Sequence, residues 1–214
     1  MNASAESEPH LVVIVDDDRE VRDALHELML SVGFEAASFG SVRELLEAQL
    51  PDRSGCLVLD VRLPGSSGLD LQHRLASSGN TKPIVFLTGH GDIPMSVQAM
   101  KAGAVDFLTK PVREQTLLDA VNAGIERDLA QRAEMQVVRV LVDRFATLTA
   151  RERQVFRAVA LGRLNKQIAY DLGLSEVTVK LHRGSVMRKI KAATVGELIR
   201  AWESLPAELR EGRP

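Results

Sequence analysis

The chain has 214 residues, 45% of them hydrophobic, which suits one large domain or two small ones with ordinary cores. Its longest apolar runs are too short to span a bilayer, and its first ten residues are polar and acidic, unlike a signal peptide. The single cysteine, Cys56, excludes a disulfide framework or a cysteine-based zinc site within this chain. We therefore expect a cytoplasmic protein that makes no membrane contact.

The charge is unevenly distributed along the chain. Residues 1–112 carry 9 Lys and Arg against 16 Asp and Glu, a net charge of −7, whereas residues 148–201 carry 11 against 4, a net charge of +7. Such asymmetry indicates two domains with different partners, and the basic part suits nucleic acid. A solvated basic surface would produce the same charge, so charge alone does not decide.

Strand-like and helix-like segments alternate in the first half of the chain. The expected strands are Leu11–Val15, Phe34–Phe39, Gly55–Asp60, Pro83–Leu87 and Val105–Leu108. The expected helices are Arg19–Val32, Ser41–Gln49, Leu69–Leu75, Ile93–Ala102 and one after Pro111. Ser41 is the expected N-cap of its helix, and Glu44 would complete a capping box. Most strands are apolar on both faces, which predicts a five-stranded parallel sheet covered on both sides, a doubly wound α/β fold.

A long helix is expected from Arg113 to about Phe145, because this segment has no proline and a single glycine, Gly124. Apolar residues approximate a heptad stripe along it: Leu129, Met135, Val138, Val142 and Phe145. The stripe is compatible with a coiled-coil dimer seam and equally with packing inside one chain.

An all-helical unit is expected from Leu148 onwards. Its helices are Ala150–Leu161, Asn165–Leu172, a third capped by Ser175 that runs to about Ile190, and Val195–Ser204. The tail after Pro206 is polar, and we expect it to be frayed.

Polar side chains follow the ends of several expected strands. The first strand is followed by Asp16, Asp17 and Asp18, the third ends in Asp60, and Thr88 and Lys110 follow the last two strands. In a doubly wound sheet, ligands bind outside the carboxyl ends of the strands. These side chains are therefore expected to converge at one edge of the sheet.

The chemistry of this set predicts a metal-assisted phosphoryl acceptor. Clustered carboxylates need a cation, and oxygen-only ligands favour Mg²⁺, or Mn²⁺ in its place. Asp17 and Asp60 are the expected ligands, supported by Asp16 directly or through water and by a backbone carbonyl near Arg62. A carboxylate can attack phosphorus, and Asp60, at the end of the central apolar strand, is the expected nucleophile.

Two further residues fit the same chemistry. The Lys110 ammonium would neutralise charge on the transferred phosphoryl group, and the Thr88 hydroxyl would bond a phosphate oxygen. Taken singly, each residue of the set has a plainer explanation as a helix cap, a turn residue or an exposed lysine. The combination carries the prediction.

The segments VVIVDDD, LVLDVRLPGSSG, FLTGHGD and MKAGAVDFLTKP resemble the receiver domain of bacterial response regulators, over residues 11 to about 125. The similarity is to the FixJ/NarL (LuxR-type) family, and within it to the FixJ/StyR group. The resemblance implies a flavodoxin-like domain in which Asp60 is phosphorylated and Mg²⁺ is bound with Asp16, Asp17 and Asp60.

The same resemblance implies roles for three residues beyond the metal. Thr88 would act as a switch, Lys110 would contact the phosphoryl group, and the bond from Lys110 to Pro111 is typically cis. Phe107 matches an aromatic residue that moves inward on activation, although an ordinary core position explains it equally well.

In the basic half, the two helices joined at Gly173 have helix-turn-helix spacing. The second is the expected recognition helix in the major groove, with Val179, Val186 and Ile190 facing the core at 100° per residue. The expected DNA contacts are Val177, Thr178, Lys180, Leu181, Gly184 and Arg188, flanked by Lys166, His182, Arg183 and Lys189.

Within that set, Lys180 could read guanine or bind phosphate, and Leu181 could contact a thymine methyl group. The flanking basic residues are better phosphate candidates. Gly184 costs ~1 kcal/mol in a helix relative to Ala, so it either permits close approach to DNA or is a neutral substitution. Arg188 is equally well explained as a solvated surface residue. Tyr170 and Trp202 are expected to pack rather than to stack on bases.

The segment LTARERQVFRAVALGRLNKQIAYDLGLSEVTVKLHRGSVMRKI resembles the LuxR-type DNA-binding domain, over about residues 147–205. The resemblance implies binding as a dimer to a two-fold site in double-stranded DNA and activation of transcription, with RNA polymerase as a partner. It gives Thr149, Arg151 and Glu152 structural roles, as an N-cap and a buried or partly buried ion pair. Many relatives carry a larger residue at the position of Gly184.

These observations divide the chain into a disordered segment (1–10), a receiver (11–125), a helical linker (126–146), a four-helix DNA-binding domain (147–205) and a tail (206–214). The leading hypothesis is a transcription factor, not an enzyme, in which a sensor histidine kinase phosphorylates Asp60. A shift of Thr88 and Phe107 would then promote dimerisation on DNA.

Two other hypotheses remain open at this point. Asp16-x-Asp18 superficially resembles the nucleophile motif of haloacid-dehalogenase-type phosphatases. Alternatively, the receiver serves only as a dimerisation module for the DNA-binding domain.

Overall fold

The computed structural model describes residues 8–89 and 93–211. The chain forms two compact units, Met1–Arg132 and Ala133–Pro214, each of which is described by itself. Most of the segment expected to be disordered, and the last three residues of the tail, lie outside the described residues.

The first unit is built on a parallel sheet whose strand order is β2-β1-β3-β6-β7. Its strands are β1 (Leu11–Val15), β2 (Glu35–Phe39), β3 (Gly55–Leu59), β6 (Ile84–Thr88) and β7 (Asp106–Thr109). β1 lies between β2 and β3, so the strand order reverses next to β1. The predicted doubly wound fold is confirmed.

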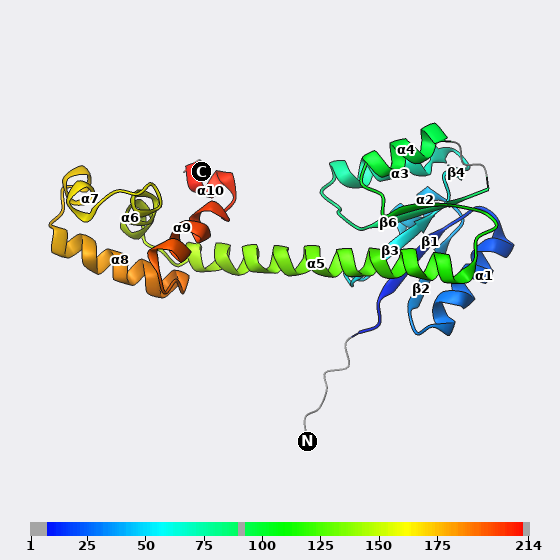
Figure 1. Cartoon of the computed structure of the whole chain (residues 1–214), viewed down its shortest axis with the longest axis horizontal. Helices are drawn as coiled ribbons and strands as arrows, with labels where there is room; N and C mark the ends of the chain where they lie inside the picture. The colour runs from blue at the N-terminus through cyan, green and yellow to red at the C-terminus, as the bar shows by residue number, and fades with distance from the viewer. Residues whose placement is uncertain (1–7, 90–92, 212–214) are drawn as a thin grey trace, which may run out of the picture. The chain divides into compact units, whose positions relative to one another are not determined.

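Helices cover both faces of this sheet (Figure 1). The helices of the first unit are α1 (Arg19–Ser31), α2 (Val42–Glu47), α3 (Gly68–Ser77), α4 (Ile93–Lys101) and the first part of α5 (Glu114–Ala146). α1 and α5 pack on one face through residues such as Met29 and Val121, and α2, α3 and α4 pack on the other.

The alternation of side chains along each strand explains this two-sided core. In β1, Val13 and Val15 face the layer of α2 to α4, whereas Val12 and Ile14 face α1 and α5. All five residues of β1 are buried. An uninterrupted apolar run is therefore what a central parallel strand requires.

One small element was not predicted. β4 (Arg62–Leu63) and β5 (Ser66–Ser67) form a two-stranded antiparallel pair directly after β3. Strands of two residues are too short to leave a periodic signal in the sequence. The pair reverses the direction of the chain, so that the start of α3 lies next to the residues that follow β3.

The second unit is helical, as predicted. Its helices are α6 (Ala150–Ala160), α7 (Asn165–Leu172), α8 (Glu176–Ile190), α9 (Val195–Glu203) and α10 (Ala207–Glu211), together with the last part of α5. Its core gathers Phe145, Phe156, Val186 and Leu198. The expectation of a frayed tail is wrong for residues 207–211, because Leu205 is buried and Leu209 packs on the core.

The long helix α5 belongs in part to each unit. Phe145 and Leu141 are buried in the core of the second unit, so this end of the predicted stripe packs within one chain. Leu129 and Met135 are exposed. Among the described helices, none combines the length and the apolar character needed to cross a membrane.

Candidate functional site

The predicted carboxylates meet at the carboxyl edge of the sheet. Asp16 follows β1 and Asp60 follows β3; both are buried, with 2% and 7% of their surface exposed, while Asp17 is exposed. Their carboxylate oxygens lie within 4.8 Å of one another. Convergence of these residues, predicted from the strand ends, is confirmed.

Lys110 lies in the same cluster. Its Nζ is 2.6 Å from Asp16 Oδ2 and 2.9 Å from Asp60 Oδ2. The backbone places it there, since Lys110 N donates to Thr88 O across β6 and β7 and the Lys110–Pro111 bond is cis, as expected. One ammonium therefore serves two buried carboxylates, with a third carboxylate beside them.

The electrostatics of this cluster leave it short of positive charge. Burial raises the pKa of Asp16, and the bonds from Lys110 only partly oppose it. Burial would lower the pKa of Lys110, but its bonds to Asp16 and Asp60 raise it instead. Three carboxylates against one ammonium form a set of hard oxygen ligands that a divalent cation fits.

The backbone around Asp60 holds its carboxylate in place. Asp60 Oδ1 accepts from Arg62 N at 3.1 Å, while Oδ2 faces Lys110. A carbonyl near Arg62 stays a predicted ligand. Thr88, the last residue of β6, is buried, with 1% of its surface exposed.

Phe107 is half-buried in β7 and lies against Phe86, with ring centroids 6.0 Å apart. It packs on the side of the sheet that carries α3 and α4. The position suits both alternatives, a core residue and an aromatic that changes its degree of burial.

Gly68 is a site residue that the sequence reasoning missed. A Cβ on Gly68 would lie 2.4 Å from Asp60 O, much closer than two such atoms can approach. Gly68 N also donates to Val61 O, so the β4–β5 pair brings the start of α3 against the end of β3. The glycine that ends PGSSG was visible in the sequence, but the contact that requires it was not.

Asp18 has a different function from its neighbours. Its Oδ1 accepts from Glu20 N and Val21 N, which makes it the N-cap of α1. This cap is the ordinary use of Asp after a strand. The geometry gives no support to Asp18 as the second carboxylate of a phosphatase motif.

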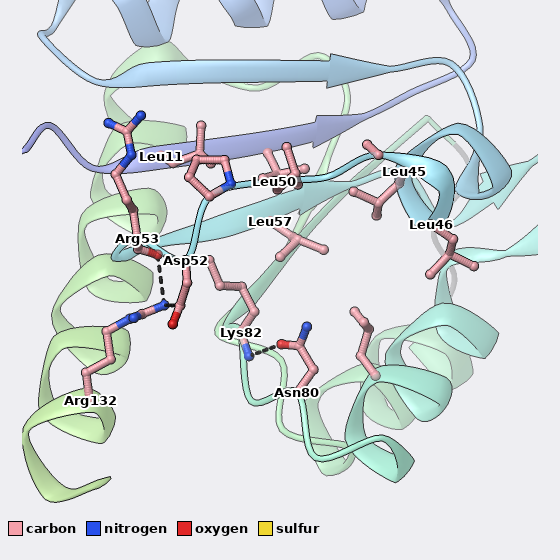
Figure 2. A pocket seen from close by; sticks show the side chains of 14 residues that line it. Leu11, Leu45, Leu46, Leu50, Asp52, Arg53, Leu57, Asn80, Lys82 and Arg132 are labelled. Carbon is pink, nitrogen blue, oxygen red and sulfur yellow. Dashed lines mark hydrogen bonds and ion pairs between the residues drawn. The ribbon is translucent and has the colours of Figure 1, made fainter. Parts of the chain in front are cut away.

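At the opposite, amino edge of the sheet, charged side chains fasten α5 to the first unit. The buried Asp128 Oδ2 accepts from Gly55 N and from Arg132 Nε, both at 2.9 Å, and lies 3.5 Å from Lys82 Nζ. Arg132 Nη2 in turn donates to Asp52 Oδ1 at 2.6 Å (Figure 2). These bonds fix residues 128–132 of α5 on the first unit.

Beside this network is a pocket of about 360 Å³ that is lined by both apolar and charged side chains (Figure 2). The apolar residues of the lining include Leu11, Leu45 and Leu57, and the charged residues include Lys82 and Arg132. Burial lowers the pKa of Lys82, although the nearby Asp128 opposes this. The pocket was not expected from the sequence.

In the second unit, α7 and α8 are joined through Gly173, which adopts a left-handed conformation with φ of 63°. Val179, Val186 and Ile190 of α8 are buried, as predicted. The expected DNA-facing side is exposed, with 68% of Val177 and 70% of Leu181 accessible. Also exposed are Lys166, Lys180, Gly184 and Arg188.

Some of the predicted DNA contacts already have partners within the chain. Arg183 Nη1 donates to Asn165 Oδ1 at 2.6 Å, and Thr178 bonds to its N-cap Ser175. Lys189 forms an ion pair with Glu152. His182 is half-buried.

The two aromatic residues singled out in the sequence differ in position. Trp202 packs edge-on against Phe156, with centroids 5.0 Å apart, as predicted. Tyr170 is 89% exposed on α7, so the expectation that it packs is wrong. α7 has only eight residues, and Ile168 and Ala169 already provide its buried side.

The Thr–x–Arg–Glu pattern has the structural role that was expected, with one change of partner. Thr149 is the N-cap of α6 and Glu152 completes a capping box. Glu152 is buried and pairs with Lys189. Arg151 instead donates to Gln154 Oε1 at 2.9 Å.

Comparisons with known proteins find a family match for each of the two units. Residues 12–122 match the response regulator receiver domain, and residues 146–201 match the luxR family of bacterial regulatory proteins. The chain therefore belongs to the response regulators that join a receiver to a LuxR-type DNA-binding domain. Members of this family are transcriptional regulators of two-component systems rather than typical enzymes.

Particular relatives extend over nearly the whole chain. Nodulation protein W of Bradyrhizobium diazoefficiens is 53% identical, covering 91% of this chain and 86% of its own length. Response regulator protein TodT of Pseudomonas putida is 45% identical, covering 93% and 88%.

Solved structures show the same relationship. The response regulator StyR is 45% identical, with a TM-score of 0.78 over 91% of this chain and 98% of its own. Full-length FixJ from B. japonicum is 35% identical, with a TM-score of 0.56 over 96% and 98%. A receiver domain implies a sensor kinase as partner, and a LuxR-type domain implies DNA binding.

Proposed function

We propose that this response regulator accepts a phosphoryl group on Asp60 from a cognate sensor histidine kinase and then binds DNA as a homodimer to activate transcription. The observation that carries the proposal is the bonding of Asp60 and Asp16 to Lys110 beside a third carboxylate, Asp17. This is the arrangement that a phosphoryl acceptor requires.

The residues of the cluster have separate roles in the transfer. A carboxylate oxygen of Asp60 attacks phosphorus, and the bond between phosphorus and the histidine nitrogen of the kinase breaks. Lys110, already bonded to Asp60, moves its donors to the added phosphoryl oxygens. The Thr88 hydroxyl, at the end of β6, bonds another of these oxygens.

Asp16, Asp17 and Asp60, with a backbone carbonyl near Arg62, would hold Mg²⁺, or Mn²⁺ in its place. The bound cation would neutralise phosphoryl charge in the transition state. No other catalytic activity is proposed for this chain.

Signal transmission starts at Thr88 and Phe107. A movement of Thr88 toward the phosphoryl group leaves space that Phe107 can fill, which changes the surface of α4 and β7. That surface already carries apolar side chains, because Ile93 is 80% exposed and Val97 and Met100 are also exposed. Burying them against a second copy would form the homodimer.

The dimer would present two recognition helices to a two-fold site on double-stranded DNA. The exposed side of α8 offers Lys180, Leu181 and Arg188 to bases and phosphates. RNA polymerase would be the next partner, and the cytoplasm, where DNA and kinase domains meet, the location. We retain the division into receiver (11–125), linker (126–146) and DNA-binding domain (147–205) as part of this proposal.

The test compares Asp60→Asn with the wild-type chain and with Asp119→Asn, an exposed aspartate on α5. Acetyl phosphate with Mg²⁺ should increase DNA binding of the wild type and of Asp119→Asn, and leave Asp60→Asn unchanged. Stimulation that survives in Asp60→Asn would refute the mechanism. Mapping the phosphoryl group to Asp16 instead would favour the phosphatase alternative.

Sedimentation with and without beryllofluoride and Mg²⁺ tests the dimerisation step. The dimer fraction should rise when beryllofluoride is present. A dimer fraction that does not change would favour a receiver that serves only as a constant dimerisation module.

A further inference from the structure

Lys189, near the C-terminal end of α8, binds two segments outside its own helix. Its Nζ lies 2.7 Å from Glu152 Oε2 in α6 and donates to Thr147 O at 3.1 Å, between α5 and α6. Only 29% of the Lys189 side chain is exposed. The Lys189 ammonium therefore binds groups of α6 and of the segment before it, on the side away from the expected DNA face.

The partner carboxylate is itself held by the backbone. Glu152 Oε2 also accepts from Thr149 N at 2.8 Å, in the capping box of α6. Burial would raise the pKa of Glu152, but the bonds from Lys189 and Thr149 lower it to about 2, so this carboxyl group is ionised at neutral pH. The Lys189 ammonium is thus paired with a carboxylate whose position is fixed by the capping box.

A second contact holds the same end of α8. Arg144 Nη1, in the last turn of α5, donates to Ile190 O at 3.2 Å. The last carbonyls of a helix lack partners within the helix, so this bond satisfies one of them. Phe145, the next residue of α5, is buried in the core and anchors that turn.

Arg188, the residue before Lys189, is exposed and differs from it in its surroundings. Arg188 precedes Lys189 by one position, which is roughly 100° around a helix. Arg188 is exposed on the same side as Leu181, whereas Lys189 is drawn toward α6. Two adjacent basic residues therefore have different surroundings.

We propose that Lys189, Glu152 and Arg144 are positioning residues that fix the C-terminal end of the recognition helix, and that Lys189 is not a phosphate contact. This inference rests on the proposed DNA binding of α8. It replaces the role that the sequence predicted for Lys189. It also makes the last turn of α5 part of the support of the recognition helix.

Glu152→Gln separates the two roles, because they predict opposite results. If Lys189 bound phosphate, removing the competing carboxylate would free the ammonium and strengthen DNA binding. If Lys189 is a positioning residue, the same substitution weakens binding, although it removes a negative charge from the DNA-binding unit. Gln retains the capping-box geometry, so α6 keeps its N-terminal cap.

The experiment uses the full chain, phosphorylated by acetyl phosphate, and the duplex that the wild type selects from a random pool. Lys189→Met and Glu152→Gln should each weaken binding at least about tenfold, comparable to the loss of one base contact. The double variant should be no weaker than the weaker single variant, because both remove the same pair. Arg144→Met should also weaken binding.

The salt dependence provides a readout that a change in fold would not imitate. Lys166→Met, at the exposed start of α7, is the matched control, and the loss of one phosphate contact should reduce the slope of log K against log salt by ~0.9. Lys189→Met should leave the slope at the wild-type value. A slope reduced in Lys189→Met, together with tighter binding by Glu152→Gln, would overturn the inference.

Hydrogen exchange tests the positioning without DNA. Amides near the end of α8 should exchange faster in Lys189→Met and Arg144→Met than in Lys166→Met. Equal exchange in all three variants would also overturn the inference. If the wild type selects no duplex, the proposed DNA binding fails, and the exchange result alone decides the role of Lys189.

Discussion

In the first unit, Lys110 joins Asp16 and Asp60 at the carboxyl edge of the sheet, and the exposed Asp17 lies beside them. In the second unit, Lys189 of α8 pairs with Glu152 of α6. Both are lysine–carboxylate contacts of 2.6–2.9 Å. They differ in stoichiometry, since one ammonium contacts two carboxylates with a third beside them in the first case, and contacts a single carboxylate in the second.

That difference in charge separates a chemical site from a structural one. The three carboxylates at Asp60 retain negative charge that Lys110 alone does not balance, and a divalent cation could balance the remainder. The pair at Glu152 is balanced, and its carboxylate also accepts from the backbone N–H of Thr149. A close contact between a lysine and a carboxylate therefore does not by itself indicate a functional site. The excess of carboxylates over ammonium groups at Asp60 is the feature that indicates one.

Removal of Lys110 should have the largest effect. Lys110→Met leaves Asp16 and Asp60 without their ammonium and should destabilise the first unit by about 3 kcal/mol. Mg²⁺ at about 100 times its dissociation constant should return up to about 2.7 kcal/mol. Thermal unfolding with and without Mg²⁺ measures both effects.

The control for that variant is Lys101→Met, at the exposed end of α4, which should change neither stability nor the response to Mg²⁺. If Lys110→Met unfolds at the wild-type temperature, the pairing of Lys110 is not important for stability. A stabilising effect of Mg²⁺ on the second unit would contradict the contrast between the two sites.

Gly68→Ala should have the next largest effect, because its Cβ would overlap Asp60 O. We expect a loss of about 1–3 kcal/mol in the first unit and slower phosphorylation of Asp60. Gly89→Ala is the matched control, since a Cβ there meets no atom of the described residues within 4 Å. Denaturant unfolding measures the stability of the two variants, and labelling by acetyl phosphate measures their phosphorylation. Equal stability and equal labelling of Gly68→Ala and Gly89→Ala would exclude the close approach of Gly68 to Asp60 O.

The Glu152 pair should give the second unit a distinct dependence on pH. The pKa of Glu152 is about 2 in the folded chain, below its ordinary 4.5, so its stabilisation is present above pH 4.5 and is lost as the pH falls through about 2. We expect a change of about 1–3 kcal/mol, as for a charged hydrogen bond. Hydrogen exchange of α6 and α8 between pH 5 and pH 2.5 should show the loss in the wild type and a weaker pH dependence in Glu152→Gln.

Gly184→Ala should have the smallest effect on stability and the opposite sign. Within the part of the chain that the structure describes, a Cβ at Gly184 meets no atom within 4 Å, so Ala should stabilise the helix by roughly 0.5–1 kcal/mol. If α8 approaches DNA closely at this position, the same methyl group should weaken binding to the selected duplex. Equal binding by Gly184→Ala and the wild type would identify Gly184 as a neutral substitution.

Much of the first unit could be predicted from the sequence because its signals are local. The apolar run of β1, the carboxylates after it and Asp60 at the end of β3 are each visible within a few residues. Parallel topology then requires the ends of these strands to meet at one edge. The pair β4–β5 and the contact of Gly68 with Asp60 depend on how a short loop folds back, and short loops leave no periodic signal.

In the second unit, local sequence signals predicted which helix faces are buried but not which side chains are paired. Helical periodicity correctly separated the buried Val186 from the exposed Leu181 on α8. It could not show that Lys189 and Arg183 already have partners, or that Tyr170 is exposed. Long polar side chains reach several ångströms, so their partners depend on which helices pack together.

The sequence by itself determined that Asp16, Asp17, Asp60 and Lys110 would share one edge, because each of them follows the end of a strand in a parallel sheet. Only the tertiary structure decided that Lys189 is balanced by Glu152, since α6 and α8 are distant in the chain and meet through the core. Strand ends are set by the local sequence, whereas the partner of a flexible lysine is set by packing.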